Sequence, residues 1–283
     1  PLFTGWTSLA EYQTGRYNQG FTNIMHNLLN YKDFSLGNAV EVLNGETYRT
    51  SGVTSHQCWS ETMVLQPIFE GMLGYRPDAL TNTADLSPRL PFDWKSFEAS
   101  NIKFGNNSFA FEFKKESNLN WVYNLTSNQN FNLNFTATLP LGSKIKSVLV
   151  NGKDVAYTIL ANNEYLDIRF DEAMNINGKT EIRIILAKEG SSTLPNYIKP
   201  DLMAESKGFR ILKQQLDGNS LKINIEGKSG STYDFKLLVG TKVLSCTGAE
   251  LIKKEADGYA LFRVTIPADK EKYQQKSILI TIK

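Results

Sequence analysis

The apolar residues of this chain change their spacing near residue 100, and this change limits the folds that the chain can adopt. Before that point they recur at the spacing of one helix face, as in the run Phe21, Ile24, Met25, Leu28 and Leu29. This run predicts a helix over 18–31, and similar patterns predict helices over 2–12 and 54–73. Beyond that point apolar and polar residues alternate, which is typical of half-buried strands. We therefore expect helices first and sheets afterwards.

Two runs of alternating residues carry the strand prediction. They consist of Phe109, Phe111 and Phe113, and of Phe131, Leu133 and Phe135. Asn151-Gly152 predicts a tight hairpin, because both positions of such a turn need a positive φ. Asp217-Gly218-Asn219 is expected to form a second turn. Further strands are expected over 181–186, 221–225, 259–266 and 277–282, and a Gly-, Ser- and Pro-rich linker over 188–201.

The predicted helix over 54–73 has the strongest local signals. Thr54 and Gln57 have the spacing of a capping box, and Pro67 is expected to kink the helix because proline lacks a backbone donor. Its apolar residues wrap most of the circumference, which predicts burial on several sides: Trp59, Met63, Val64, Ile68, Phe69, Met72 and Leu73. About eighty residues of this kind cannot cover one another's apolar surface. We therefore expect further helices ahead of Pro1.

Charge and composition argue against several classes of partner. The chain has 31 basic and 29 acidic residues, a net charge of +2, and no sustained basic face, so we expect no nucleic acid partner. No apolar run approaches the roughly eighteen residues of a membrane helix, so we expect no membrane partner. The sequence opens on Pro1 without a signal-like segment, which leaves the compartment open.

The sequence also lacks the usual marks of a metal or nucleotide site. Its two histidines come without clustered acids, which argues against a metal site, and His26 on its helix face is expected to be structural. A phosphate-cradling glycine loop and a Gly-x-Ser-x-Gly elbow are both missing. We expect no cofactor. Cys58 and Cys246 lie in regions of different character and are predicted to be buried thiols.

Candidate chemistry gathers around a glycine-bounded, aromatic-lined loop at 45–60. Glu41 lies just ahead of this stretch, and Glu46 and Glu61 are competing acids. Such a loop can hold a carboxylate beside an aromatic sugar platform, which hydrolysis of a glycosidic bond requires of one of its two acids. The alternatives are that Glu41 is a solvated loop acid or a cap, and that Glu61 complements the dipole of its helix.

Five further residues are candidates for sugar binding. His56 and Gln57 could hydrogen-bond to sugar hydroxyls, or could serve the predicted capping box instead. Trp6, Tyr48 and Trp59 could be stacking platforms, because flat aromatic faces pack against sugar rings. The alternative for each aromatic residue is a place in the core.

Several motifs also resemble a known family in their order along the chain. They are PLFTGWTSLAEY at 1–12, VEVLNG at 40–45, SHQCWSETM at 55–63, and LSPRLPFDW at 86–94 followed by IKFG at 102–105. The first three resemble the last hairpins of the six-hairpin α/α-toroid glycosidases, with the nearest likeness to bacterial amylo-α-1,6-glucosidases of glycogen debranching and processing α-glucosidase-like enzymes. The fourth is similar to the step from the toroid into a C-terminal β domain. The resemblance covers residues 1–115.

The resemblance implies a fold and a catalytic role. The expected fold is multidomain α + β, with the last helices of an α/α toroid at 1–84 and two antiparallel β-sandwich-like domains at 85–190 and 200–283. In such enzymes a Glu 18 residues before the Trp is the general base of an inverting hydrolysis, and Glu41 and Trp59 have this spacing. The general acid would come from sequence upstream of this chain, in the remainder of the parent enzyme. The expected substrate is an α-linked oligosaccharide or polysaccharide.

Two other functions remain open. The chain could be a non-catalytic module that binds carbohydrate, or its β domains could have a structural or adhesive role. Fold resemblance alone does not establish chemistry.

Overall fold

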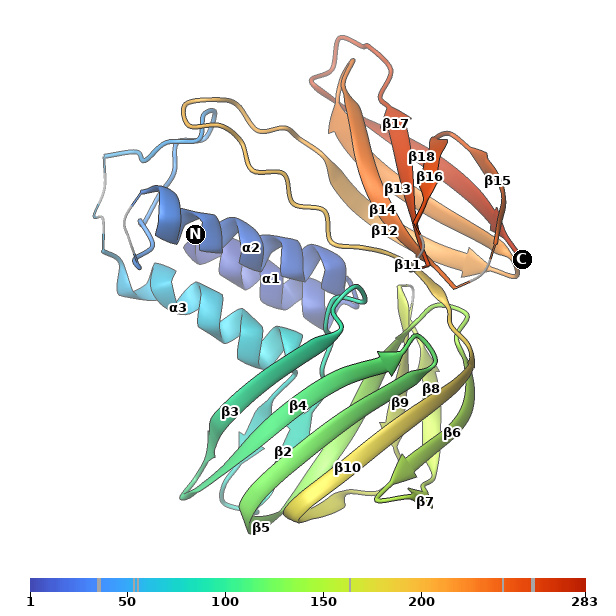
Figure 1. Cartoon of the computed structure of the whole chain (residues 1–283). Coiled ribbons are helices and arrows are strands. Elements are labelled where there is room, and N and C mark those ends of the chain that lie inside the picture. The colour runs from blue at the N-terminus through green and yellow to red at the C-terminus, as the bar shows by residue number, and fades with distance from the viewer. Residues whose placement is uncertain (35–36, 53, 55, 163, 241, 256–257) are drawn as a thin grey trace. The chain divides into compact units, whose positions relative to one another are not determined.

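The computed structural model describes the whole chain except residues 35–36, 53, 55, 163, 241 and 256–257 (Figure 1). It divides into two compact units. Unit 1 consists of Pro1–Met72, Thr193–Leu237 and Lys242–Lys283, and unit 2 consists of Leu73–Ser192 and Leu238–Thr241. Among the described residues, none of the helices has the length and apolar character needed to cross a membrane.

Unit 1 begins with three α-helices and one π-helix. They are α1 (Leu2–Gln13), α2 (Tyr17–Asp33), α3 (Cys58–Gln66) and the π-helix η1 (Pro67–Met72). The helices predicted over 2–12 and 18–31 are confirmed. The third begins at Cys58, with Gln57 as an N-cap whose side chain makes no capping hydrogen bond, so the predicted capping box at Thr54 is wrong. At Pro67, which has no N–H to donate, the α-helix gives way to the wider π turn.

Small residues and one amide allow these helices to approach closely. A Cβ added at Gly5 would lie 2.3 Å from Cβ of Met63, so α1 passes directly over α3. The hydroxyl of Ser8 donates to the carbonyl of Gly20 at 2.7 Å and joins α1 to α2. The side chain of Asn27 donates to the carbonyl of Met63 at 3.2 Å and joins α2 to α3. Figure 1 shows these helices lying side by side.

Much apolar surface of these helices remains exposed. Met63, Val64, Met72 and Leu73 are buried, but Trp59, Leu65 and Phe69 are 53%, 59% and 38% exposed. The prediction that the third helix is buried on several sides is therefore wrong. The three described α-helices do not cover this surface.

The predicted fold class, a partial α/α toroid followed by two β-sandwich-like domains, is wrong. Strands make up 52% of the structure and helices 16%, and the described residues form no toroid of helical hairpins. The physical reason is that the described helices end at Met72 and the described elements that follow are strands, so three α-helices are too few to close a ring of hairpins. The Cys58 side chain is exposed, so its assignment as a buried thiol is also wrong, and Cys246 is half-buried.

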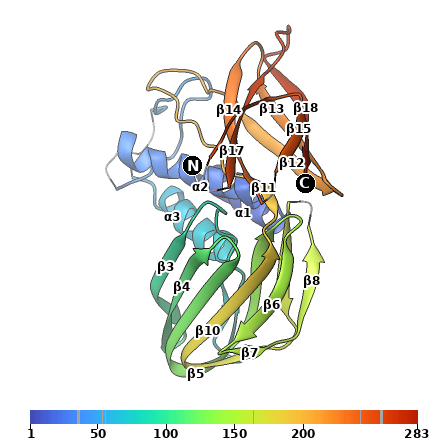
Figure 2. The same ribbon diagram turned by 45° about the vertical axis from the view of Figure 1, so that its right-hand side comes forward.

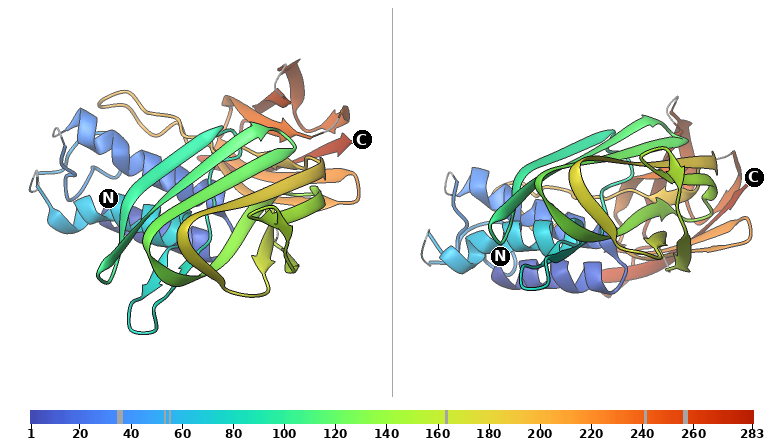
Figure 3. Two further views of the ribbon diagram at one scale, coloured as in Figure 1. Left: turned by 60° about the horizontal axis from the view of Figure 1, so that its bottom comes forward. Right: turned by 90° about the horizontal axis from the view of Figure 1, so that it is seen from below.

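Unit 2 is built on one sheet of ten strands, in which β1-β2-β5-β10-β6-β7 form the main path and β3-β4 and β8-β9 join it through β5. The strands are β1 (Arg76–Asp78), β2 (Thr83–Leu86), β3 (Ser96–Phe104), β4 (Asn107–Ser117), β5 (Asn120–Pro140), β6 (Lys144–Val150), β7 (Lys153–Asp154), β8 (Tyr157–Ala161), β9 (Tyr165–Phe170) and β10 (Met174–Lys188). The 21-residue β5 pairs with β4 along its first part and with β9 along its last part. Figure 3 shows β5 and β10 curving strongly along their length.

The alternating pattern predicted the core of unit 2 correctly. Phe109, Phe111 and Phe113 of β4 are buried, as are Phe131, Leu133 and Phe135 of β5. The predicted hairpin turn is also confirmed, because Asn151 and Gly152 have φ values of 49° and 78° between β6 and β7. The side chain of Asn151 accepts a hydrogen bond from the main chain of Glu181 at 2.9 Å, which ties this turn to β10.

The C-terminal part of the chain forms two four-stranded sheets, ordered β12-β13-β18-β15 and β11-β14-β17-β16. The strands are β11 (Ser191–Thr193), β12 (Arg210–Asp217), β13 (Ser220–Lys228), β14 (Thr232–Val239), β15 (Val243–Thr247), β16 (Glu250–Lys254), β17 (Tyr259–Thr265) and β18 (Tyr273–Ile282). Alternate residues of β13, β14, β17 and β18 are buried. Figure 2 labels these four strands on the ribbon. The turn predicted at Asp217-Gly218-Asn219 joins β12 to β13, and Gly218 has φ 55°.

Gly190 in unit 2 provides a test of backbone packing. A Cβ there would lie 2.2 Å from the carbonyl oxygen of Leu141 and 2.6 Å from that of Pro140. Main-chain atoms cannot rotate away, so Gly190→Ala is expected to lower the free energy of unfolding by about 2–3 kcal/mol, as overpacking does. Urea denaturation measures this loss. Gly45→Ala is the matched control, because a Cβ there meets nothing within 4 Å, and an equal effect of both variants would contradict the prediction.

Candidate functional site

Glu41 lies at the base of a short loop in unit 1. Its main-chain N–H donates to the carbonyl of Thr54 at 3.4 Å, and Leu43 and Thr50 form an isolated antiparallel bridge farther along the loop. Glu41 is half-buried. The contact with Thr54 brings Glu41 beside the segment that continues to His56 and α3. Val53 and Ser55, which belong to the predicted loop at 45–60, lie outside the described residues.

Tyr48 anchors this loop to the rest of unit 1. Its ring is buried, and its hydroxyl donates to Asp33 at 2.7 Å, on the last residue of α2. Lys199 also donates to Asp33, at 2.7 Å. The main chain of Tyr48 bonds to Met203 and Ala204 at 3.0 and 2.8 Å. Tyr48 therefore joins three segments that are far apart in the sequence.

The protonation states of Tyr48 and Asp33 favour the hydrogen bond between them. Burial and the hydrogen bond to Asp33 raise the pKa of the Tyr48 hydroxyl, so the hydroxyl stays protonated and remains a donor. For Asp33, burial alone would raise the pKa, but the hydrogen bonds from Lys199 and Tyr48 outweigh burial and lower it. The carboxylate is therefore ionised at neutral pH and holds both donors.

The remaining candidates differ in exposure. Trp6 on α1 is 51% exposed and packs edge-on against Phe3 at 5.6 Å, and Trp59 on the first turn of α3 is 53% exposed. His56 is exposed, with its Nδ1 4.0 Å from Oε1 of Glu61. Gln57 is half-buried at the N-cap of α3. Two indole faces are thus available to a ligand.

The two other acids near the loop have separate surroundings. Glu46 is exposed, and its main-chain N–H donates to the side chain of Asn44 at 3.0 Å. Glu61 lies in the first turn of α3, where a negative charge complements the helix dipole. Among the described residues, His, Cys, Asp and Glu side chains form no group of three or more that could hold a metal ion.

Unit 1 also contains a hollow that no sequence motif predicts. Its volume is about 330 Å³, and its lining includes His26, Ser206, Lys207, Arg210, Glu226 and Tyr273. Burial lowers the pKa of His26, so its imidazole is neutral at neutral pH. These residues come from α2, from the segment before β12 and from β12, β13 and β18. No spacing rule links such distant positions, so the sequence carries no signal for this hollow.

A second unpredicted feature is a charged pair in the interior of unit 2. Lys115 donates to the carbonyl of Phe92, and its Nζ lies 4.3 Å from the ring centre of Trp121. Burial lowers the pKa of Lys115 to about 8, against the attraction of Glu189 and Asp93. Burial likewise raises the pKa of Glu189 to about 7, against the attraction of Lys115.

The sequence did carry a signal for Lys115. It lies two residues after Phe113, in phase with the apolar side of β4, where a charged residue needs a partner.

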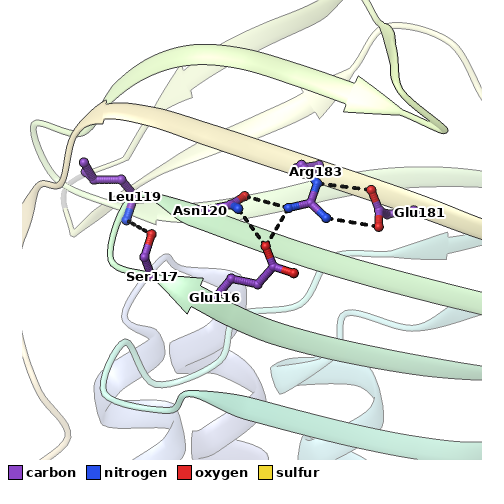
Figure 4. Close-up of polar contacts among 6 residues, drawn as sticks. All are labelled: Glu116, Ser117, Leu119, Asn120, Glu181 and Arg183. Carbon is purple, nitrogen blue, oxygen red and sulfur yellow. Dashed lines mark hydrogen bonds and ion pairs between the residues drawn. The ribbon is translucent and has the colours of Figure 1, made fainter.

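Arg183 of β10 is the centre of a polar cluster in unit 2 (Figure 4). Its guanidinium contacts both carboxylate oxygens of Glu181, at 3.1 and 3.2 Å, and lies 2.7 Å from a carboxylate oxygen of Glu116. It also reaches the side chain of Asn120 at 3.3 Å. The cluster links β4, β5 and β10, and its partly exposed acids already have their partners. We assign it a structural role.

Comparisons with known proteins add a distant likeness. No family model matches the sequence, and no curated protein does. Among solved structures, the chain is similar to the crystal structure of Ara127N-Se, a GH127 β-L-arabinofuranosidase from Geobacillus stearothermophilus T6, with 8% sequence identity and a TM-score of 0.28. The match covers 97% of this chain and 47% of that chain, so this chain spans about half the length of that enzyme. A TM-score this low does not establish a shared fold, and the resemblance to amylo-α-1,6-glucosidases and processing α-glucosidases is not confirmed.

Proposed function

We propose that the chain acts in the hydrolysis of O-glycosidic bonds, with Glu41 as the general base of an inverting reaction. The observation that carries the proposal is the hydrogen bond from Glu41 to Thr54. It brings the main chain of Glu41, whose side chain is half-buried, beside the segment that holds His56, Gln57 and the exposed indole of Trp59. A carboxylate, planar polar groups and an aromatic face are what a sugar-cleaving site needs on one side of its substrate.

The proposed chemistry assigns one role to each group. The Glu41 carboxylate takes a proton from water, which attacks the anomeric carbon as the bond to the leaving oxygen breaks. A second carboxylic acid gives its proton to that oxygen, and it would come from polypeptide other than these 283 residues. In an inverting enzyme the two carboxyl groups stand about 6.5–9.5 Å apart, so that the water fits between them. The proposed substrate is an α-linked oligosaccharide or polysaccharide.

The test is to follow hydrolysis of α-linked glycosides by the complete protein that carries this chain. Proton NMR during the first turnovers shows the configuration of the released sugar, and the proposal expects inversion. Retention would overturn the inverting mechanism. Hydrolysis that is unaffected by the loss of Glu41 would overturn the assignment of the base.

A second candidate is a carbohydrate-binding module without catalysis. The half-exposed rings of Trp6 and Trp59 favour it, because aromatic platforms suffice for binding. Saturable binding of a polysaccharide, combined with no release of sugar by the complete protein, would support this function over the first.

Trp59 offers a direct test of sugar contact that both candidates share. Trp59→Ala is expected to weaken substrate binding about two- to tenfold, because the loss of one aromatic contact costs about 0.5–1.5 kcal/mol. The weaker binding should appear as a higher KM or Kd, while kcat changes little. Leu65→Ala on the same helix is the matched control, since Leu65 is 59% exposed but has no ring. Equal effects of the two variants would contradict a stacking role.

A further inference from the structure

We propose that the hollow of unit 1 lined by Arg210, Glu226 and Tyr273 is a separate binding site for a neutral sugar. It uses residues other than those of the Glu41 loop, so it goes beyond the proposed hydrolysis. Its volume of about 330 Å³ lies at the lower end of the range for small-molecule pockets, which suits one or two sugar rings.

The positions of the lining residues follow from strand pairing. Arg210 of β12 lies directly across from Glu226 of β13, and Tyr273 of β18 pairs with Lys228 on the other side of β13. His26 of α2 completes the lining together with residues of the segment that precedes β12. Three adjacent strands of one sheet therefore carry a carboxylate, a guanidinium and a phenol.

The charges of the hollow favour a neutral ligand. The Nε of Arg210 lies 3.1 Å from Oε1 of Glu226, and Lys207 Nζ lies 3.6 Å from a carboxylate oxygen of Asp201. An anionic ligand would compete with these acids for their cations. Sugar hydroxyls both donate and accept, so they can bond to Glu226 and to Arg210 without separating the pair. The hydroxyl of Ser206 and the neutral imidazole of His26 can each both donate and accept a hydrogen bond.

Tyr273 provides the flat face that sugar recognition requires. Tyr273 is 39% exposed, and the Nζ of Lys272 lies 5.9 Å from the centre of its ring. A Cβ added at Gly208 would lie 2.7 Å from Cε1 of this ring, and Gly208 has φ 76°. A glycine at this position lets the main chain approach the ring closely and supports it. The ring is therefore held in place while still exposing apolar surface next to the polar groups of the hollow.

The experiment is calorimetric titration of the purified chain with glucose, galactose and maltose, and with glucuronate as the anionic probe. We use a Trp6→Ala/Trp59→Ala background, so that sugar bound at the exposed indoles does not contribute. The expected result is binding of at least one neutral sugar in the millimolar range, with glucuronate weaker. Tyr273→Ala and Tyr273→Leu should each weaken this binding about tenfold, and Tyr273→Phe should retain it.

Three outcomes would overturn this inference. They are no heat of binding for any neutral sugar, tighter binding of glucuronate than of glucose, and equal affinity of the Tyr273→Leu and Tyr273→Phe variants. Thermal melting of each variant shows whether it is folded. If the sugar site is disproved, the hydrolysis proposal still stands. The Glu41 variant tests turnover, whereas the Tyr273 variants test binding at a different place.

Discussion

Replacing Glu41 with glutamine is expected to lower kcat for glycoside hydrolysis about 10²–10⁴-fold, the contribution typical of a general acid or base. Glutamine has nearly the same size and can keep the same hydrogen-bonding neighbours, but it cannot take a proton from water. The side chain is half-buried, and the hydrogen bond to Thr54 comes from the main chain, so stability should be nearly unchanged. Steady-state kinetics of the complete protein, together with its melting temperature, measure both quantities.

Glu46→Gln is the matched control for this experiment. Glu46 lies in the same loop and is exposed, and its hydrogen bond to Asn44 also comes from the main chain. Its variant should therefore keep full activity. If Glu41→Gln and Glu46→Gln have the same kcat, neither acid is the base. If only Glu46→Gln loses activity, the base has been assigned to the wrong acid of the loop.

Replacing Lys115 with methionine is expected to destabilise unit 2 by about 1–3 kcal/mol at neutral pH, because Glu189 loses the attraction of its cation and must take up a proton to remain buried. Glu189 is 5% exposed, so water cannot take the place of the ammonium group. The double variant Lys115→Met/Glu189→Gln removes both charges and should recover most of the stability. Urea denaturation of the two variants measures the difference. Equal stability of the single and double variants would contradict the coupling between the two charges.

The pKa shifts of the same pair predict how stability depends on pH. Burial raises the pKa of Glu189 from 4.5 to about 7, so the folded state binds more protons than the unfolded state in this interval. The contribution of Glu189 to stability therefore falls as pH rises through it. Burial lowers the pKa of Lys115 from 10.5 to about 8, so the contribution of Lys115 rises between these values. The pair should be least favourable between about pH 7 and 8. In the double variant this minimum should disappear from urea denaturation measured across the pH range.

Local structure was predictable where it depended on neighbouring residues. The spacing of Phe21 and Ile24 predicted α2, and the alternation of Phe109 and Phe111 predicted β4. The turn at Asn151-Gly152 was predictable because few other pairs adopt positive φ twice in succession. In each case the signal lies within a few residues, which is the range over which helix and turn geometry acts.

The errors arose where a local pattern was extended to tertiary structure. The apolar circumference of the helix predicted over 54–73 suggested burial, but Trp59 and Phe69 are exposed, because burial depends on which elements are present to cover a helix. The Thr54 capping box had the correct spacing, yet α3 begins at Cys58. Tyr48 was proposed as a platform because flat aromatic faces pack against sugar rings, and its contact with Asp33 depends on the folded chain.

The sequence by itself determined the first two helices and the apolar faces of strands such as β4 and β5, because these properties follow from the period of the side chains along the chain. Only the tertiary structure decided that Glu41 lies beside Thr54, that Lys115 and Glu189 are buried within electrostatic range of each other, and that His26 and Tyr273 line one hollow. The physical reason is that pairing between distant segments depends on the packing free energy of the whole fold, to which a local pattern contributes only part.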